Sequence, residues 1–160
     1  MLFRSRGEGV MPEWKTEMKE IPIGKGRKLK DGKEVAILSF GHPGNFAGAA
    51  IRDLKSEGIT PAHYDMRFVK PIDEELLHEV FGKFKKIITI EDGTVTGGFG
   101  SAVLEFMAEH KYNAEVVIMG IPDRLVEHGT PKQLYDEIGL DANGIAKQVR
   151  AMMNVMVSVK

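Results

Sequence analysis

The stretch Lys86–Gly100, KIITIEDGTVTGGFG, decides the fold. Its β-branched run Ile87–Ile90 is bounded by charged residues, which is typical of a buried strand. Glu91 and Asp92 follow at the carboxyl end of that strand. Glycines interrupt the pattern at 93, 97, 98 and 100, and a helical period begins at Ser101 with Val103, Leu104, Met107 and Ala108 on one face. This order predicts a strand–loop–helix unit of a parallel α/β sheet, in which ligands and partners meet the carboxyl ends of the strands.

The composition of the chain limits the classes of protein to which it can belong. The chain has 160 residues, enough for one domain with a single core, and its 42% hydrophobic and 28% charged residues are typical of globular proteins. A net charge of −1 gives no basic surface for nucleic acid. No apolar run is long enough for a membrane span or a signal peptide, and there is no cysteine. We therefore expect no nucleic-acid or membrane partner and a cytoplasmic location.

The rest of the chain predicts alternating strands and helices. Residues 1–20 are expected to form a linker or extension and residues 21–160 the domain. Gly26–Lys30 is expected to pair with the core strand Val35–Phe40 as a lysine-rich edge strand. Further strands are expected at Ala62–Met66, continuing extended over 67–70, and at Glu115–Gly120. Helices are expected over Phe46–Ser56 with Asn45 as N-cap, from Glu74 to about Phe84 with Asp73 as N-cap, Pro131–Ile138 and Asn143–Val155.

This order predicts the α/β class, with three layers. Helices should cover both faces of a mostly parallel sheet of roughly five strands, which carries one additional antiparallel edge strand.

The glycine loop matches no nucleotide motif. No Lys-Ser/Thr pair follows Gly100, and Gly97 to Gly100 lacks the order GxGxxG. The favoured interpretation is a tight turn in which glycines allow close backbone approach. The alternative is an anion held by the free amides at the start of the helix near Ser101.

The two carboxylates and the histidines also fail to form a catalytic set. Glu91 and Asp92 are adjacent on a strand, so they should point to opposite faces, with one of them facing a subunit or domain interface. His42 and His128 lack an accompanying nucleophile motif, and the five histidines lack the spacing of metal ligands. We therefore expect no catalytic residue and no metal ligand. The candidate interface loop comprises Glu91, Asp92, Gly93, Gly97 and Gly98.

Four stretches resemble one enzyme family. Residues 65–73, DMRFVKPID, and 90–101, IEDGTVTGGFGS, resemble the signatures of transketolase carboxy-terminal domains, which also occur in 2-oxoacid dehydrogenase beta chains. Residues 120–129, GIPDRLVEHG, and 137–145, EIGLDANGI, are similar to the 1-deoxy-D-xylulose-5-phosphate synthase family in particular. The resemblance covers nearly the whole chain.

The resemblance implies a larger enzyme. Members of that synthase family are cytoplasmic homodimers that use thiamine diphosphate and Mg²⁺ to join the two-carbon unit of pyruvate to D-glyceraldehyde 3-phosphate. Their cofactor-binding residues lie in two preceding domains, which would be the partners of this chain. The resemblance implies that this chain is a third domain, a scaffold that binds no cofactor itself and is inactive alone.

One family site maps onto this sequence. The family carries Tyr-Pro-Arg-Gly between its second and third domains, and the arginine is taken to hold the substrate phosphate. Arg6-Gly7 matches the second half of that motif, whereas Arg4-Ser5 replaces tyrosine and proline. Arg6 is thus the candidate phosphate-binding residue. Two alternatives stay open: another transketolase-like or 2-oxoacid dehydrogenase beta-chain domain, and a free-standing anion-binding module.

Overall fold

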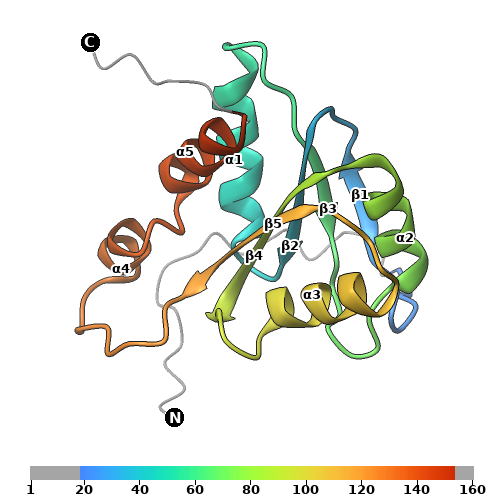
Figure 1. The fold of residues 1–160 in the computed structure, drawn as a ribbon. Helices are drawn as coiled ribbons and strands as arrows, with labels where there is room; N and C mark the ends of the chain where they lie inside the picture. The colour runs from blue at the N-terminus through green and yellow to red at the C-terminus, as the bar shows by residue number, and fades with distance from the viewer. Residues whose placement is uncertain (1–18, 154–160) are drawn as a thin grey trace.

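A computed structural model describes residues 19–153. Strands and helices alternate along most of the chain (Figure 1). The strands are β1 Arg27–Lys30, β2 Val35–Phe40, β3 Ala62–Asp65, β4 Lys86–Thr94 and β5 Glu115–Ile121. The helices are α1 Gly44–Lys55, α2 Glu74–Lys83, α3 Phe99–Glu109, α4 Pro131–Glu137 and α5 Ala142–Met152. Within the described part of the chain, no helix has the length and apolar character needed to cross a membrane.

The sheet contains five strands in the order β1-β3-β2-β4-β5. β1 runs antiparallel to β3, and the other three pairs are parallel, so the antiparallel edge strand is one of the five. The predicted mixed α/β sheet is confirmed, but the predicted pairing of β1 with Val35–Phe40 is wrong. Both edges of β2 are taken by parallel neighbours, and β1 instead joins β3, where Arg27 forms an ion pair with Asp65 at 3.0 Å.

Helices cover both faces of the sheet, as predicted. α1 and α5 lie on one face and α2 and α3 on the other (Figure 1). Alternation along the strands explains the division, because successive side chains point to opposite faces. Ile37 and Ile88 pack toward α1 and α5, whereas Leu38 and Ile87 pack toward α2 and α3. Two hydrophobic clusters therefore share one sheet.

The start of α2 connects the edge of the sheet to the core. The Asp73 side chain accepts a hydrogen bond from the Leu76 amide at 3.2 Å, which confirms the predicted N-cap. Its second oxygen accepts from the Gly26 amide at 2.9 Å, just before β1. One carboxylate thus fixes both the helix start and the chain that enters the edge strand.

Several predicted boundaries are wrong. α1 begins at Gly44 after Pro43, so Asn45 is inside the helix and does not cap it. β3 ends at Asp65, and the predicted extended continuation is broken by Arg67 at φ 57°. α5 begins at Ala142 because Asp141 caps it, and it ends at Met152 instead of Val155. Residues 154–160, which include Val155, lie outside the described part of the chain.

Candidate functional site

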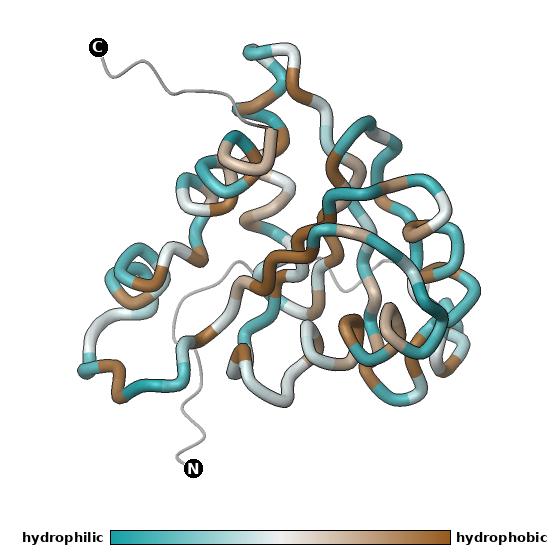
Figure 2. The backbone as a smooth tube through the Cα atoms, viewed as in Figure 1, coloured by the Kyte–Doolittle hydropathy of each residue, from teal (hydrophilic) through white to brown (hydrophobic). Residues whose placement is uncertain are grey.

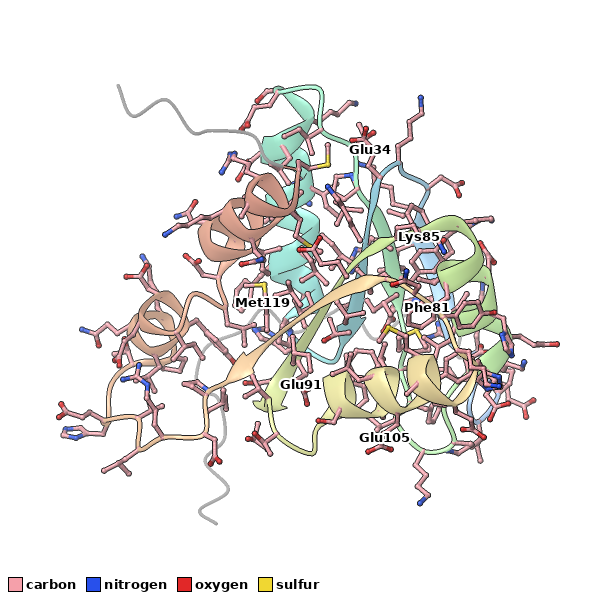
Figure 3. All side chains as sticks on the ribbon, in the orientation of Figure 1. Glu34, Phe81, Lys85, Glu91, Glu105 and Met119 are labelled. Atoms are coloured by element: carbon pink, nitrogen blue, oxygen red, sulfur yellow. The ribbon has the colours of Figure 1, made fainter. Side chains whose placement is uncertain are left out.

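The carboxyl ends of β2, β4 and β5 lie at one edge of the sheet, beside the loop 95–98 that leads into α3. β4 runs through Glu91 and Asp92 to Thr94, so the acidic pair lies within the strand and not in a turn after it. Glu91 lies at this end of the sheet, whereas Glu34 and Lys85 lie at the opposite end (Figure 3). This carboxyl edge is the place where an α/β sheet presents its functional groups.

Glu91 is a buried anchor for α3. Its side chain is only 3% exposed. One carboxylate oxygen accepts a hydrogen bond from the Phe99 amide and the other from the Gly100 amide, both at 2.9 Å. A negative charge is favourable at a helix N-terminus, where the first amides have no partner within the helix. Glu91 therefore serves the fold directly.

This anchor explains why α3 differs from the prediction. The helix begins at Phe99, two residues before Ser101, and its buried residues are Phe99, Gly100, Val103 and Phe106. The predicted stripe included Leu104, Met107 and Ala108, of which Ala108 is exposed. The amides of the first two helical residues are occupied by the carboxylate, so the structure does not support an anion site made from them.

The glycine loop is a tight turn, as the favoured interpretation predicted. Gly97 has φ 74°, a conformation that side-chain-bearing residues rarely adopt. A Cβ on Gly98 would lie 2.2 Å from the Glu91 carboxylate and 2.3 Å from the Thr94 carbonyl oxygen. Gly93 lies within β4, and its Cβ would lie 2.9 Å from the same carboxylate. The glycines leave space for the buried carboxylate.

Asp92 points to the other face of the sheet. Its carboxylate accepts a hydrogen bond from the hydroxyl of Tyr135 in α4 at 3.0 Å. The two adjacent carboxylates thus contact different helices, as alternation along a strand predicts. Each is engaged in a contact within the domain, and they do not converge on a common point.

Sequence reasoning missed an aromatic cluster beside Asp92. The Phe46 ring lies edge-on to both the His42 and Tyr135 rings, with centroids 5.1 Å apart in each case. His42 is exposed, and it follows β2 at the same carboxyl edge. The sequence already placed His42 just after a predicted strand, which indicated that it lies at this edge of the sheet. Nothing in the sequence indicated that Tyr135, 43 residues after Asp92, would join it.

A second unpredicted polar pair lies inside the sheet. The Ser39 hydroxyl oxygen lies 2.9 Å from His63 Nε2, and the hydroxyl donates to the Tyr64 carbonyl at 3.1 Å. With the hydroxyl hydrogen directed at that carbonyl, an imidazole protonated at Nε2 completes the contact by donating to the hydroxyl oxygen. Burial lowers the pKa of His63 to about 4, against the opposing effect of Asp65. The pair is a neutral structural contact.

His128 and Arg6 are the remaining candidate residues from the sequence. His128 is exposed in the loop before α4. Arg6, the candidate phosphate-binding residue, lies outside residues 19–153 and has no described structure. Among the described residues, no three or more His, Cys, Asp or Glu side chains are grouped so that they could hold a metal ion.

Comparisons with known proteins agree with this architecture. The family model for the transketolase C-terminal domain matches residues 24–145. A 1-deoxy-D-xylulose-5-phosphate synthase of Cytophaga hutchinsonii is 60% identical over 152 residues, which cover 95% of this chain and 24% of that protein. The synthase of Bacteroides thetaiotaomicron is 56% identical over 145 residues, covering 90% and 22% respectively.

A solved structure extends the comparison to three dimensions. A chain described as a split gene transketolase, inactive beta4 tetramer, superposes with a TM-score of 0.78 at 35% identity, covering 86% of this chain and 45% of that one. The present chain spans about a quarter of the length of the two curated relatives. The match to the family model and the two-layered helical covering of a five-stranded mixed sheet lead to one conclusion: the chain belongs to the transketolase C-terminal domain family.

Proposed function

We propose that this chain is the C-terminal domain of a 1-deoxy-D-xylulose-5-phosphate synthase. The observation that carries the proposal is the 60% identity to the Cytophaga synthase over 95% of the chain. The whole enzyme would release the carboxylate of pyruvate as CO₂ and form a carbon–carbon bond between the remaining two-carbon unit and the aldehyde carbon of D-glyceraldehyde 3-phosphate. It would act in the cytoplasm on these small soluble substrates.

In this proposal the domain is a scaffold. The described residues offer no group of carboxylate or histidine ligands that fits Mg²⁺, so we assign thiamine diphosphate and Mg²⁺ to the amino-terminal and central domains of the longer protein. The segment from Gly93 to Gly98, which comprises the end of β4 and the loop 95–98, includes exposed Thr94, Thr96 and Gly97 at the carboxyl edge. We assign this segment to the contact with the central domain or with the second subunit of a homodimer.

The domain alone should be inactive. Its carboxylates at the carboxyl edge contact backbone amides of α3 or the tyrosine of α4, and its Ser39 and His63 side chains are buried in contact with each other. The split-gene neighbour, whose matching chain is described as an inactive tetramer, is consistent with this expectation.

A reconstitution experiment tests the proposal. The 160-residue chain is mixed with the separately purified amino-terminal and central domains, and formation of 1-deoxy-D-xylulose 5-phosphate from pyruvate and glyceraldehyde 3-phosphate is measured. We expect turnover in the mixture and none with either part alone. Turnover by the chain alone, or a mixture that binds no better than unrelated proteins and stays inactive, would overturn the proposal.

Arg6 provides a second prediction within the reconstituted enzyme. If Arg6 holds the substrate phosphate, Arg6→Ala removes charge-assisted hydrogen bonds of about 1.5–3 kcal/mol, which raises the KM for glyceraldehyde 3-phosphate roughly 10- to 100-fold. The KM for pyruvate should not change, because pyruvate carries no phosphate. Arg4→Ala is the matched control, and equal effects of the two variants would refute the assignment.

A further inference from the structure

Two isoleucines in the segment that leads into β1 are exposed, although isoleucine is among the residues that proteins most often bury. Ile21 is 54% exposed and Ile23 is 79% exposed. Figure 2 shows hydrophobic residues gathered along the strands in the centre of the molecule, in the core of the domain. The two isoleucines depart from this pattern.

A tight turn presents Ile23 to the outside. The Lys25 amide donates a hydrogen bond to the Pro22 carbonyl at 3.2 Å, and Gly24 within the turn has φ 75°. In a type II turn, glycine commonly takes the position that requires a positive φ, and Ile23 precedes it here. Turns favour Gly, Pro, Asn, Asp and Ser, so the turn itself gives no reason for a β-branched apolar residue at its tip.

The turn lies against the connection that leads from β3 to α2. A Cβ on Gly24 would lie 2.8 Å from the Pro71 side chain, and a Cβ on Gly26 would lie 3.0 Å from the Asp65 carbonyl oxygen. Arg67 belongs to the same connection, two residues after Asp65. The isoleucine turn and this connection therefore form one surface at the carboxyl end of β3.

Arg67 contributes an incompletely paired positive charge to this surface. Its side chain is only 23% exposed, yet among the described residues it forms no hydrogen bond, and its ion pair is with Asp65 at 3.8 Å. The same Asp65 oxygen already accepts a hydrogen bond from Arg27 at 3.0 Å. Two guanidinium groups thus share one carboxylate oxygen. The N–H donors of Arg67 remain available for a second carboxylate, whose two oxygens fit the planar fork of a guanidinium.

The backbone at Arg67 is strained. Arg67 has φ 57°, and the Phe68 amide donates a hydrogen bond to the Met66 carbonyl, so Arg67 is the central residue of a γ-turn with positive φ. Turns of this kind are rare and strained. Strained residues of this kind cluster at sites that bind other groups, where the strain is retained for function.

We propose that this surface docks the central domain of the longer protein, with a carboxylate of that domain bound to Arg67 and an apolar surface of it covering Ile23. The inference rests on the proposed function. In the proposed synthase, the central domain precedes this chain and is joined to it through the residues before Ile21. This tether keeps the central domain beside the isoleucine turn at a high effective concentration, which a separate molecule does not have. Arginine is also one of the residues that carry most of the binding energy at interfaces.

Calorimetric titration of the 160-residue chain with the separately purified amino-terminal and central domains tests the inference. Arg67→Gly removes the guanidinium and preserves the turn, because glycine adopts a positive φ without strain. We expect its Kd to rise roughly 10- to 100-fold through the loss of charge-assisted hydrogen bonds. Arg52→Ala removes an exposed arginine from α1 as the control and should leave Kd unchanged.

Further variants separate the two parts of the surface. Arg67→Lys keeps the charge without the planar fork, so its Kd should lie between those of the wild type and Arg67→Gly. Ile23→Asp should raise Kd at least about 10-fold, since it replaces buried apolar area with a charge, whereas Ile23→Leu should bind like the wild type. Replacing the partner carboxylate should weaken binding of the wild type but add nothing to the loss in Arg67→Gly.

An Arg67→Gly variant that binds as tightly as Arg52→Ala would overturn the inference, and the synthase proposal would stand if the mixture still turns over. A wild-type chain that binds neither preceding domain would overturn both. The unmodified chain covers the case in which Arg67→Gly fails to fold. Its Kd should rise with increasing salt, because salt screens a charge pair, and a Kd independent of salt would rule out the carboxylate contact.

Discussion

Replacing Glu91 with alanine is expected to lower the free energy of unfolding by about 3 kcal/mol, the largest effect of any single change at the carboxyl edge. The carboxylate is buried and accepts hydrogen bonds from two amides at the start of α3. Its removal leaves both amides without a partner in a site that water does not readily reach, and it also removes the negative charge from the helix N-terminus.

Thermal or urea unfolding checks this expectation, with a fall in Tm of roughly 6–12 °C for a chain of this size. Glu91→Gln keeps one acceptor oxygen and should fall between the wild type and Glu91→Ala. Glu105→Ala is the control, because Glu105 is an exposed glutamate on the same helix (Figure 3). If Glu91→Ala unfolds at the same temperature as Glu105→Ala, the carboxylate does not anchor α3.

Acidification should destabilise the domain through His63. Its pKa is about 4 in the folded chain, compared with an ordinary value of 6.5, because the ring is buried. Between these values the unfolded chain binds a proton that the folded chain does not. The contribution of His63 is therefore fully present above pH 6.5 and is lost as the pH falls to about 4, a decrease of about 3 kcal/mol in the free energy of unfolding.

Urea unfolding at a series of pH values measures this dependence. His63→Gln cannot take up the proton, so its stability should change less between pH 6.5 and 4 than that of the wild type, whatever its stability at neutral pH. His128→Gln removes an exposed histidine and should keep the wild-type slope. A His63→Gln slope equal to the wild-type slope would show that another group carries the acid sensitivity.

The carboxylates and glycines at the carboxyl edge of the sheet serve contacts within the domain. Its two strand carboxylates are used to fix α3 and α4, and its glycine loop is shaped around the buried Glu91. A rigid edge of this kind suits a domain that positions neighbouring domains. This is the role that we propose for it in the longer synthase.

The sequence by itself determined the α/β class, the order of the strands and helices, and the covering of both faces by helices. Those features depend on local patterns: the continuous apolar run of β2 predicts a strand that is buried on both faces, and a period of 3.6 marks the buried stripe of α5. The Asp73 cap was also predictable, because its acceptor and donor are three residues apart.

Only the tertiary structure decided which strand β1 joins, where α3 begins and what Glu91 and Asp92 contact. β1 joins β3 because parallel neighbours occupy both edges of β2, and this pairing brings Arg27 to Asp65, 38 residues away. The Asp92 contact depends on Tyr135, 43 residues away. Such pairs leave no spacing pattern in the chain, because the path of the intervening backbone sets their distance. The start of α3 likewise depended on the burial of Glu91 beneath it, which packing determines and local propensity does not.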